Sequence, residues 1–410
     1  MKIAKIFPVV IISLLLLEAG YPRDNSGFFS VFLKNNSDIN RVNELVELPL
    51  DSLAVLYPGF DSTGVTITED DNAVNFETVY DEASGKKKLL LGLSFKPGET
   101  KEIIFSKGAA APGDKITQAY LGGKKNYIKT DGYYTGGNFE SISFTSVPPD
   151  HFAHNALYQY EGPGWESEKV GYRLYLDDRN RTDIFGKKEP GLITDKIGKE
   201  DLVSDGKESY QQMQDWGQDI FKVGNSLGIG SVAAYYDSVI TISDYDSATC
   251  EIFDNNLLST VKTTHYGWNI NNQKTNVECY YSISAGSRLT HVIVKPENEI
   301  ENFCTGIAKH KGTEFFVSDN KDGWNYIALW GKQTTANDNL GAAVFYKNSD
   351  VAKISEDALS HFVILNPDEK NIGYYFAAAW EQEPNGIKSR DEFQKYLDEE
   401  AEKLNKPVQY

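Results

Sequence analysis

The segment Gly171-Tyr172-Arg173-Leu174-Tyr175-Leu176 shows the pattern that decides the fold. Neighbouring side chains in a β-strand point to opposite faces, so Tyr172 and Leu174 share one face and Arg173 lies on the other. One apolar face beside one more polar face is typical of a half-buried antiparallel strand. Tyr172 and Arg173 can therefore point the same way only at a bulge or a strong twist.

Similar short runs continue along the chain on both sides of this segment. We expect further strands at 231–236, 239–242, 280–284, 290–294, 326–330, 342–346, 361–365 and 373–380. Helical patterns of roughly ten to fifteen residues do not recur between these runs, which argues against a parallel α/β fold. The sequence therefore predicts an all-β protein whose large antiparallel β-sandwich, the catalytic domain, occupies residues 113–385.

Shorter all-β and helical parts flank this domain. Before it, turn residues separate apolar runs at 29–33, 53–57, 65–68, 89–95 and 102–105. This regular spacing predicts a small N-terminal β-sandwich domain over 21–112, with a linker at 108–113. After it, Ser389 and Glu392 form a capping box ahead of apolar residues at helical spacing, which predicts a C-terminal helix within 386–410.

The first twenty residues have the pattern of a secretory signal. Lys2 and Lys5 precede an apolar run at 6–17, and Glu18-Ala19-Gly20 follows it. The run is too short to span a bilayer, and Tyr21 stands where a lipoprotein would carry its lipidated cysteine. We therefore expect a signal peptide at 1–20 and an exported protein, periplasmic or secreted, with no membrane span.

Composition excludes some partners and leaves other features open. The chain of 410 residues has a formal net charge of −18, which disfavours nucleic acid as a partner. In an oxidising compartment Cys250 and Cys279 could pair, but these two and Cys304 could equally be three buried thiols. The chain has no Gly-x-Ser-x-Gly elbow, phosphate-binding loop or dinucleotide fingerprint, so we expect no cofactor.

Chemically capable residues are densest between positions 151 and 188. Histidine is the side chain whose ordinary pKa lies nearest neutral pH, which makes His154 a candidate general base. His151 and His154 could also bind a metal, but no third ligand follows at a suitable spacing, so we expect no metal. Glu161 and Glu166 flank a turn beside Trp165, which indicates either a glycosidase carboxylate pair with a stacking ring or a polar loop with a packing ring.

Basic residues follow in the same region. Residues 171–188 carry a net charge of +2 and include Arg173 and Arg179. An arginine fork matches a sugar carboxylate or sulfate, although a solvated hairpin with paired charges would show the same composition. Lys222, which stands between two apolar residues, is another candidate. Weaker candidates of the same kind are His265, Arg288, Lys309 and His310.

Several strings together resemble a family from polysaccharide-degrading bacteria that is known as a domain of unknown function. They are His154-Asn155-Ala156-Leu157, Gly162-Pro163-Gly164-Trp165-Glu166-Ser167-Glu168, Tyr172-Arg173-Leu174-Tyr175, Asp183-Ile184-Phe185-Gly186-Lys187, Asp215-Trp216-Gly217 and Lys222-Val223-Gly224-Asn225-Ser226-Leu227-Gly228. The resemblance implies a galactose-mutarotase-like β-sandwich that acts on uronate-containing glycans such as pectin and ulvan. One member that the chain resembles is an ulvan oligosaccharide dehydratase, which removes water from a non-reducing terminal uronic acid and leaves a 4,5-unsaturated residue.

Such a dehydration sets requirements that the candidate residues can be tested against. The proton leaves the carbon beside a carboxylate, so the site must neutralise that carboxylate, supply a base and protonate the departing hydroxyl. We expect Arg173, with Arg179 or Lys222 behind it, to stabilise the developing charge. His154 or Tyr172 would be the base and the other the acid.

Two further residues complete the predicted site. Trp165 would stack on the sugar, and Glu166 would bind its hydroxyls or orient His154. The alternatives are a polysaccharide lyase that uses the same proton abstraction, a non-catalytic glycan-binding protein, and a sugar epimerase or mutarotase. The uronic acid, its linkage and the oligomeric state do not follow from the sequence.

Overall fold

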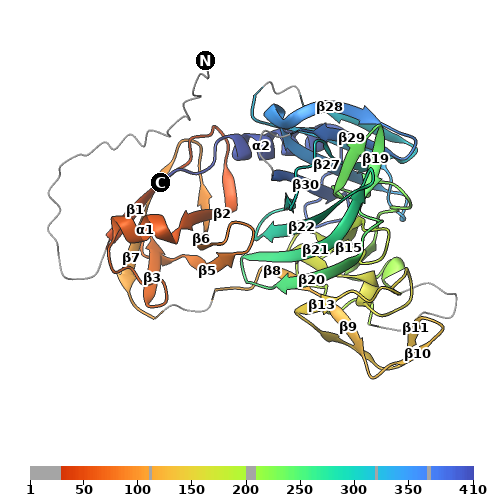
Figure 1. Ribbon diagram of the computed structural model, residues 1–410. Helices are drawn as coiled ribbons and strands as arrows, with labels where there is room; N and C mark the ends of the chain where they lie inside the picture. Colours follow the sequence, from red (N-terminus) through yellow and green to blue (C-terminus); the bar gives the residue numbers. More distant parts are fainter. Residues whose placement is uncertain (1–28, 110–112, 200–208, 319–321, 367–370) are drawn as a thin grey trace, which may run out of the picture.

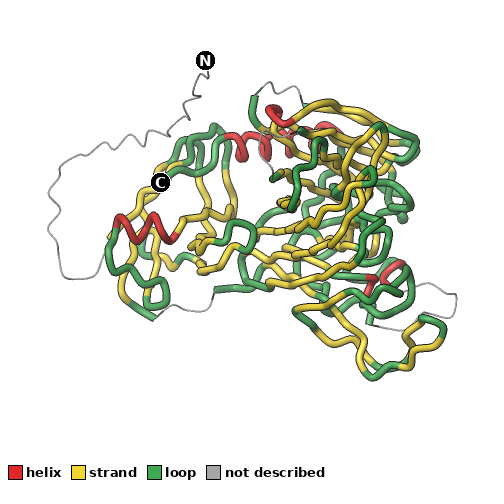
Figure 2. Tube along the Cα trace, viewed as in Figure 1, coloured by secondary structure: helices red, strands yellow, loops and turns green. Residues whose placement is uncertain are grey.

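The computed structural model describes residues 29–109, 113–199, 209–318, 322–366 and 371–410. Antiparallel strands make up most of these residues, and Figure 2 shows them running through nearly the whole molecule. The predicted all-β fold is confirmed. The signal peptide expected at 1–20 and positions 110–112 of the expected linker lie outside the described residues.

The N-terminal part contains two small sheets around one apolar core. The sheets have the strand orders β1-β7-β3-β4 and β2-β6-β5. Both contribute to the core, for example through Phe105 from the first and Leu91 from the second. The elements are β1 (Phe29–Lys34), β2 (Arg41–Pro49), α1 (Leu50–Leu56), β3 (Val65–Glu69), β4 (Asn72–Ala73), β5 (Asn75–Asp81), β6 (Lys86–Phe95) and β7 (Thr100–Lys107).

The strand expected at 53–57 is wrong, because helix α1 occupies most of that run. Pro49 is extended and forms the N-cap, and Asp51 lies in the first turn, where a negative charge favours a helix. Leu53 is fully buried against the small sandwich. A short apolar run is compatible with either a strand or one buried face of a helix, and packing decides between them.

A nine-stranded antiparallel sheet forms the centre of the large part, in the order β13-β20-β21-β22-β23-β30-β27-β26-β25. The longest of its strands have 13 and 12 residues, and the sheet lies within the large part on the right of Figure 1. They are β13 (Phe144–Ser146), β20 (Ser247–Phe253), β21 (Leu258–Ile270), β22 (Gln273–Ser284), β23 (Leu289–Pro296), β25 (Thr313–Val317), β26 (Trp324–Lys332), β27 (Asn339–Lys347) and β30 (Ile372–Trp380).

Both faces of this sheet are covered. In β27, Ala343 and Phe345 face helix α2 (Arg390–Asn405), whereas Ala342 and Val344 face the main core. Phe393 is among the helix residues that pack on the sheet. The Ser389 side chain accepts a hydrogen bond from the Glu392 N–H, so the predicted N-cap and C-terminal helix are confirmed.

Two five-stranded sheets cover the main-core face. Their orders are β17-β16-β15-β14-β8 and β19-β18-β24-β29-β28. Their strands are β8 (Thr117–Tyr120), β14 (Gly164–Ser167), β15 (Gly171–Leu174), β16 (Thr182–Lys187), β17 (Gly217–Asp219), β18 (Ala233–Tyr236), β19 (Ser238–Thr241), β24 (Phe303–Ala308), β28 (Val351–Glu356) and β29 (Ser360–Leu365). Short 3-10 helices are η1 (Gln159–Glu161), η2 (Ser209–Gln211) and η3 (Asn348–Asp350).

A separate extension made of two hairpin-like pairs projects from the large part, at the lower right of Figure 1. Strand β9 pairs with β12, and β10 pairs with β11. The strands are β9 (Gly122–Lys125), β10 (Ile128–Thr130), β11 (Tyr133–Thr135) and β12 (Asn138–Ser141). This extension reaches the residues considered below as a candidate site.

The end of the chain returns to the N-terminal part, where Lys34 and Gln409 form a backbone bridge. All three cysteines are buried and free, so they lie in the structure as separate thiols. In the described ranges, no helix is long and apolar enough to cross a membrane. The expected domain boundaries at 112 and 385 stay predictions.

Candidate functional site

Arg173 lies at the centre of a buried charged cluster on one face of the β14–β17 sheet. In the strand register, Arg173 of β15 stands opposite Asp183 of β16. Its Nη2 donates to Oδ2 of Asp183 at 2.7 Å and to Oδ2 of Asp219 at 2.6 Å. All three side chains are nearly or fully buried. One guanidinium therefore holds two carboxylates away from water.

Aromatic rings enclose this guanidinium. Its Cζ lies 4.7 Å from the ring centroid of Tyr175, 5.3 Å from that of Phe185 and 5.2 Å from that of Tyr210. Such cation–π contacts stabilise a desolvated arginine. The Tyr175 hydroxyl also donates to Oδ2 of Asp183 at 2.6 Å. These contacts hold the Arg173 side chain in place. Arg173 can therefore support the residues that contact it.

The surroundings of Asp219, the second carboxyl of this cluster, shift its pKa. Burial raises the pKa of Asp219 well above its usual value, and the neighbouring Asp183 and Glu161 raise it further, against the opposing effect of Arg173. Asp219 therefore keeps its proton to a higher pH than an ordinary aspartate does.

Glu161 connects this buried cluster to the surface. Its Oε2 lies 3.8 Å from Nη1 of Arg173, and its Oε1 accepts a hydrogen bond from Nη2 of Arg179 at 2.6 Å. The same Oε1 lies 3.1 Å from the backbone nitrogen of His154 and 3.1 Å from its Nδ1. Glu161 is 6% exposed and the His154 side chain is 56% exposed. Glu161 therefore connects the buried guanidinium of Arg173 to the solvent-exposed imidazole of His154.

This contact brings Nδ1 of the His154 ring against a carboxylate oxygen. A carboxylate only accepts hydrogen bonds, so the position of Nδ1 beside Glu161 favours the neutral tautomer that carries its hydrogen on Nδ1. The Nε2 of the neutral ring is then left with a lone pair. A histidine oriented by a carboxylate in this way is suited to accept a proton.

Arg179 is the other partly exposed group of the site. Its Nε and Nη2 donate to the two carboxylate oxygens of Asp177, at 2.8 and 2.5 Å, and its Cζ lies 3.8 Å from the ring centroid of Tyr175. In the described part of the chain, no group accepts a hydrogen bond from Nη1. The side chain is 25% exposed, so Nη1 is the nitrogen that could meet an anion.

The loop that carries His154 and Glu161 has an unusual backbone. Among the described residues other than glycine, asparagine and aspartate, positive φ occurs only at His154 (61°), Ala156 (60°), Tyr160 (40°) and Glu161 (71°). Left-handed conformations at such residues cost free energy, and they cluster at functional sites. The Tyr160 hydroxyl donates to the Thr194 carbonyl at 2.9 Å, which helps to hold the loop in this conformation.

Tyr172 lies on the opposite face of β15 from Arg173, as strand alternation predicts. Its hydroxyl donates to the Arg288 carbonyl at 2.7 Å and accepts from the Ala378 N–H at 2.8 Å. Burial raises the pKa of Tyr172 well above its usual value. The structure therefore places Tyr172 in the main core, away from His154, with its hydroxyl already paired.

Trp165 and Glu166 are also buried by packing. Trp165 is 0% exposed, and its Nε1 donates to Oγ1 of Thr290 at 2.8 Å. Glu166 is 0% exposed, pairs with Nζ of Lys187 at 2.9 Å, and accepts from the Thr194 N–H at 2.7 Å. Neither side chain presents a surface to a ligand in this structure.

The last two predicted binding residues lie apart from the charged cluster. The Lys222 side chain is exposed, and within the described ranges no ion pair joins it to the cluster. The His265 ring is buried, with Nε2 2.7 Å from Nδ2 of Asn180, the residue after Arg179. Burial lowers the pKa of His265 to about 3. Of the predicted site residues, the structure brings together His154, Arg173 and Arg179.

Signals for the other members of the cluster are weaker in the sequence. Tyr175 follows Arg173 by two positions and so shares its strand face, a signal that was available. Asp183 stands at a plausible hairpin distance from Arg173. Asp219 lies 46 residues after Arg173 in the chain, and only the pairing of β16 with β17 brings it near.

No metal site accompanies these residues in the part of the chain that the structure describes. No three histidine, cysteine, aspartate or glutamate side chains there are arranged to hold a metal ion.

Comparison with known proteins adds a family and distant relatives. The chain is 23% identical over 279 residues to "Uncharacterized protein P7" of Formosa agariphila, a match that covers 60% of this chain and 65% of that protein. The chain therefore spans less than two thirds of the length of this relative.

Among solved structures, the chain is similar to a protein in the glycosyl hydrolase family 38 from Enterococcus faecalis, with a TM-score of 0.45 at 9% identity, covering 94% of this chain and 47% of that one. It is also similar to an alpha-mannosidase from Enterococcus faecalis V583, with a TM-score of 0.44 at 8% identity, covering 93% and 45%. The chain spans about half the length of these two proteins, and at such scores the likeness carries no functional argument.

A family model described as "Domain of unknown function (DUF4861)" matches residues 33–409, which is nearly the whole of the described chain and includes every residue of the charged cluster. The chain belongs to this family.

Proposed function

We propose that the protein is a carbohydrate-active dehydratase, a hydro-lyase that removes water from the non-reducing-end uronic acid of ulvan-type oligosaccharides. The observation that carries the proposal is the shared carboxylate oxygen of Glu161, which holds both His154 and Arg179 at 3.1 and 2.6 Å. The resemblance of the chain to an ulvan oligosaccharide dehydratase supports the same reaction. As an exported protein it would meet its substrate in the periplasm or outside the cell.

The reaction needs two proton transfers, one from C5 and one to the departing hydroxyl, and it breaks one carbon–oxygen bond. Nε2 of His154 takes the C5 proton, the electrons of the C5–H bond form the C4=C5 double bond, and the C4–O bond breaks. The departing hydroxyl takes up the proton from the imidazolium and leaves as water. One histidine therefore serves as base and then as acid, which removes the need for Tyr172.

Arg179 supports this step electrostatically. Removal of the C5 proton places negative charge on the carbon beside the uronate carboxylate and on its oxygens. Nη1 of Arg179 is available to bind that carboxylate, and an arginine suits a planar carboxylate well. Because the guanidinium is already fixed by Asp177 and Tyr175, it can stabilise the charge without reorganising.

Arg173 is a positioning residue in this proposal. It does not reach the surface, being 2% exposed. Its Nη1 donates to the Tyr160 carbonyl at 3.4 Å and lies near Oε2 of Glu161. Through these two contacts it supports the strained loop that presents His154.

The experiment is incubation of purified protein with saturated uronate-terminated oligosaccharides, followed by mass spectrometry and ultraviolet absorbance. We expect a product lighter by one water, of unchanged chain length, with new absorbance from the conjugated carboxylate. Shortened products with that absorbance would assign a polysaccharide lyase instead. Binding with no change of mass on several uronate glycans would assign a non-catalytic glycan-binding protein.

A further inference from the structure

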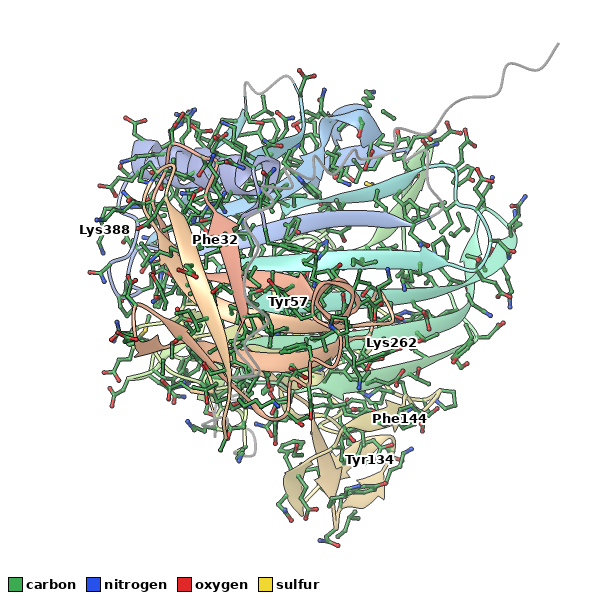
Figure 3. All side chains as sticks on the ribbon, turned by 90° about the vertical axis from the view of Figure 1, so that its left-hand side faces the viewer. Phe32, Tyr57, Tyr134, Phe144, Lys262 and Lys388 are labelled. Carbon is green, nitrogen blue, oxygen red and sulfur yellow. The ribbon has the colours of Figure 1, made fainter. Side chains whose placement is uncertain are left out.

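We infer that the β9–β12 extension, residues 122–141, is a binding subsite for the sugar units that follow the terminal uronate, and that it selects longer anionic oligosaccharides. The inference rests on the proposed function, since the terminal sugar is taken to lie at His154. Figure 3 shows the extension below the body of the molecule, with Tyr134 in it and Phe144 near its base.

The extension is attached directly to the loop that carries His154. The Tyr134 N–H donates to the Asn155 carbonyl at 2.9 Å, and the Lys124 N–H donates to the Leu157 carbonyl at 2.9 Å. Nζ of Lys129 also pairs with Asp150 at 2.6 Å. Two backbone bonds just after His154 and one ion pair before it therefore fix the extension beside the candidate site.

Large apolar side chains are exposed on this extension. Tyr127 is 43% exposed, Ile128 is 69% exposed and Tyr133 is 51% exposed. Among the described residues, two of the seven exposed aromatic side chains lie in the extension, and a third, Phe144, follows it by three positions. Tyrosine offers an apolar ring and a polar tip, a combination suited to the faces and hydroxyls of a sugar.

Edge-to-face contacts hold the two exposed tyrosine rings in place. The Tyr127 ring lies 4.8 Å from Tyr134 at an interplanar angle of 78°, and the Tyr133 ring lies 5.1 Å from Phe152 at 89°. Side chains that are ordered before binding lose less entropy when a ligand arrives. The extension thus presents fixed rings rather than mobile ones.

The charge of the extension fits an anionic glycan. Residues 122–141 contain Lys124, Lys125 and Lys129 against Asp131 and Glu140, a net charge of +1 in a chain of −18. Lys124 is buried and Lys129 is paired with Asp150. Lys125 is exposed and is the cation best placed to meet a uronate carboxylate or a sulfate group.

The test compares a uronate-terminated disaccharide with a hexasaccharide of the same glycan. We expect Tyr127→Ala to lower the ratio of kcat/KM for the hexasaccharide to that for the disaccharide by about tenfold or more. Tyr127→Leu, which keeps apolar bulk against Tyr134, should lower it similarly. Tyr80→Ala is the matched control, because Tyr80 of the N-terminal part is also an exposed tyrosine, at 51% against 43% for Tyr127.

Calorimetric binding of the hexasaccharide separates this inference from the proposed function. Turnover with wild-type length dependence in both Tyr127 variants would overturn the subsite and leave the dehydratase proposal standing. Hexasaccharide binding that depends on Tyr127, without dehydration of any substrate, would support the subsite and reject the dehydratase. Equal binding by the wild type and both variants would also overturn the subsite.

Discussion

Nδ1 of His154 lies 3.1 Å from Oε1 of Glu161, and this contact joins an exposed imidazole to a carboxylate that is itself almost buried. Because Arg179 binds the same oxygen at 2.6 Å, the candidate base and the candidate anion-binding group are positioned by one atom. The position of each therefore depends on Glu161.

Replacement of Glu161 by glutamine tests this dependence. Glutamine keeps an oxygen that can accept from Arg179, so the fold should survive. The neutral amide no longer places a charged oxygen beside Nδ1 of His154, and we expect kcat to fall by about 10- to 100-fold. Steady-state kinetics on a uronate oligosaccharide would measure it, and wild-type kcat in a folded Glu161→Gln variant would reject the role.

Arg173 and Arg179 should differ in what their loss does to stability. Arg173→Met leaves Asp183 and Asp219 buried without their cation, and we expect a loss of about 3–5 kcal/mol in the free energy of unfolding. Arg179→Met, at a side chain 25% exposed, should cost much less stability and mainly reduce activity. Urea denaturation of both variants measures the difference, and equal stability losses would contradict it.

Asp219 should make the protein less stable as the pH rises. Its pKa is raised in the folded state, so the folded state binds more protons than the unfolded state above pH of about 4. Stability is therefore full below that pH and is lost as the pH rises through the folded pKa. Asp219→Asn should flatten the pH dependence of the unfolding free energy, and parallel curves for variant and wild type would contradict the raised pKa.

His265 should make the protein less stable as the pH falls into the acid range. Its pKa is about 3 in the fold, below the usual value of about 6.5, so the unfolded state binds the proton first. Stability is present above pH of about 6.5 and is lost as the pH falls toward 3. His265→Gln should reduce this acid loss in denaturation curves between these limits, and an unchanged slope would show that the ring is not a buried neutral group.

The strand pattern could be predicted from sequence because alternation is local. The run at 171–176 correctly places Tyr172 and Arg173 on opposite faces, and the runs at 326–330, 342–346 and 373–380 are parts of β26, β27 and β30. The run at 53–57 carried no such alternation, and its packing as a helix depends on contacts distant in sequence.

The site was harder to predict, because residue type does not reveal burial or partners. Trp165 suits a sugar platform by type, yet it fills the main core. Asp219 reaches Arg173 only through strand pairing across 46 positions. Tyr160 and Glu161 adopt left-handed backbone conformations. Such a conformation is predicted from glycine or asparagine, and neither residue is one of these.

The most direct test of the central claim compares two histidines that each contact a glutamate. His361 on β29 has its Nδ1 3.0 Å from Oε2 of Glu356, in a different sheet from Arg173, and so provides a matched control for His154. Water loss from a saturated uronate-terminated oligosaccharide is followed by mass spectrometry for the wild type, His154→Gln and His361→Gln. We expect His154→Gln to slow dehydration by about 100-fold or more while His361→Gln retains the wild-type rate; dehydration at the wild-type rate by a folded His154→Gln variant would contradict the assignment of His154.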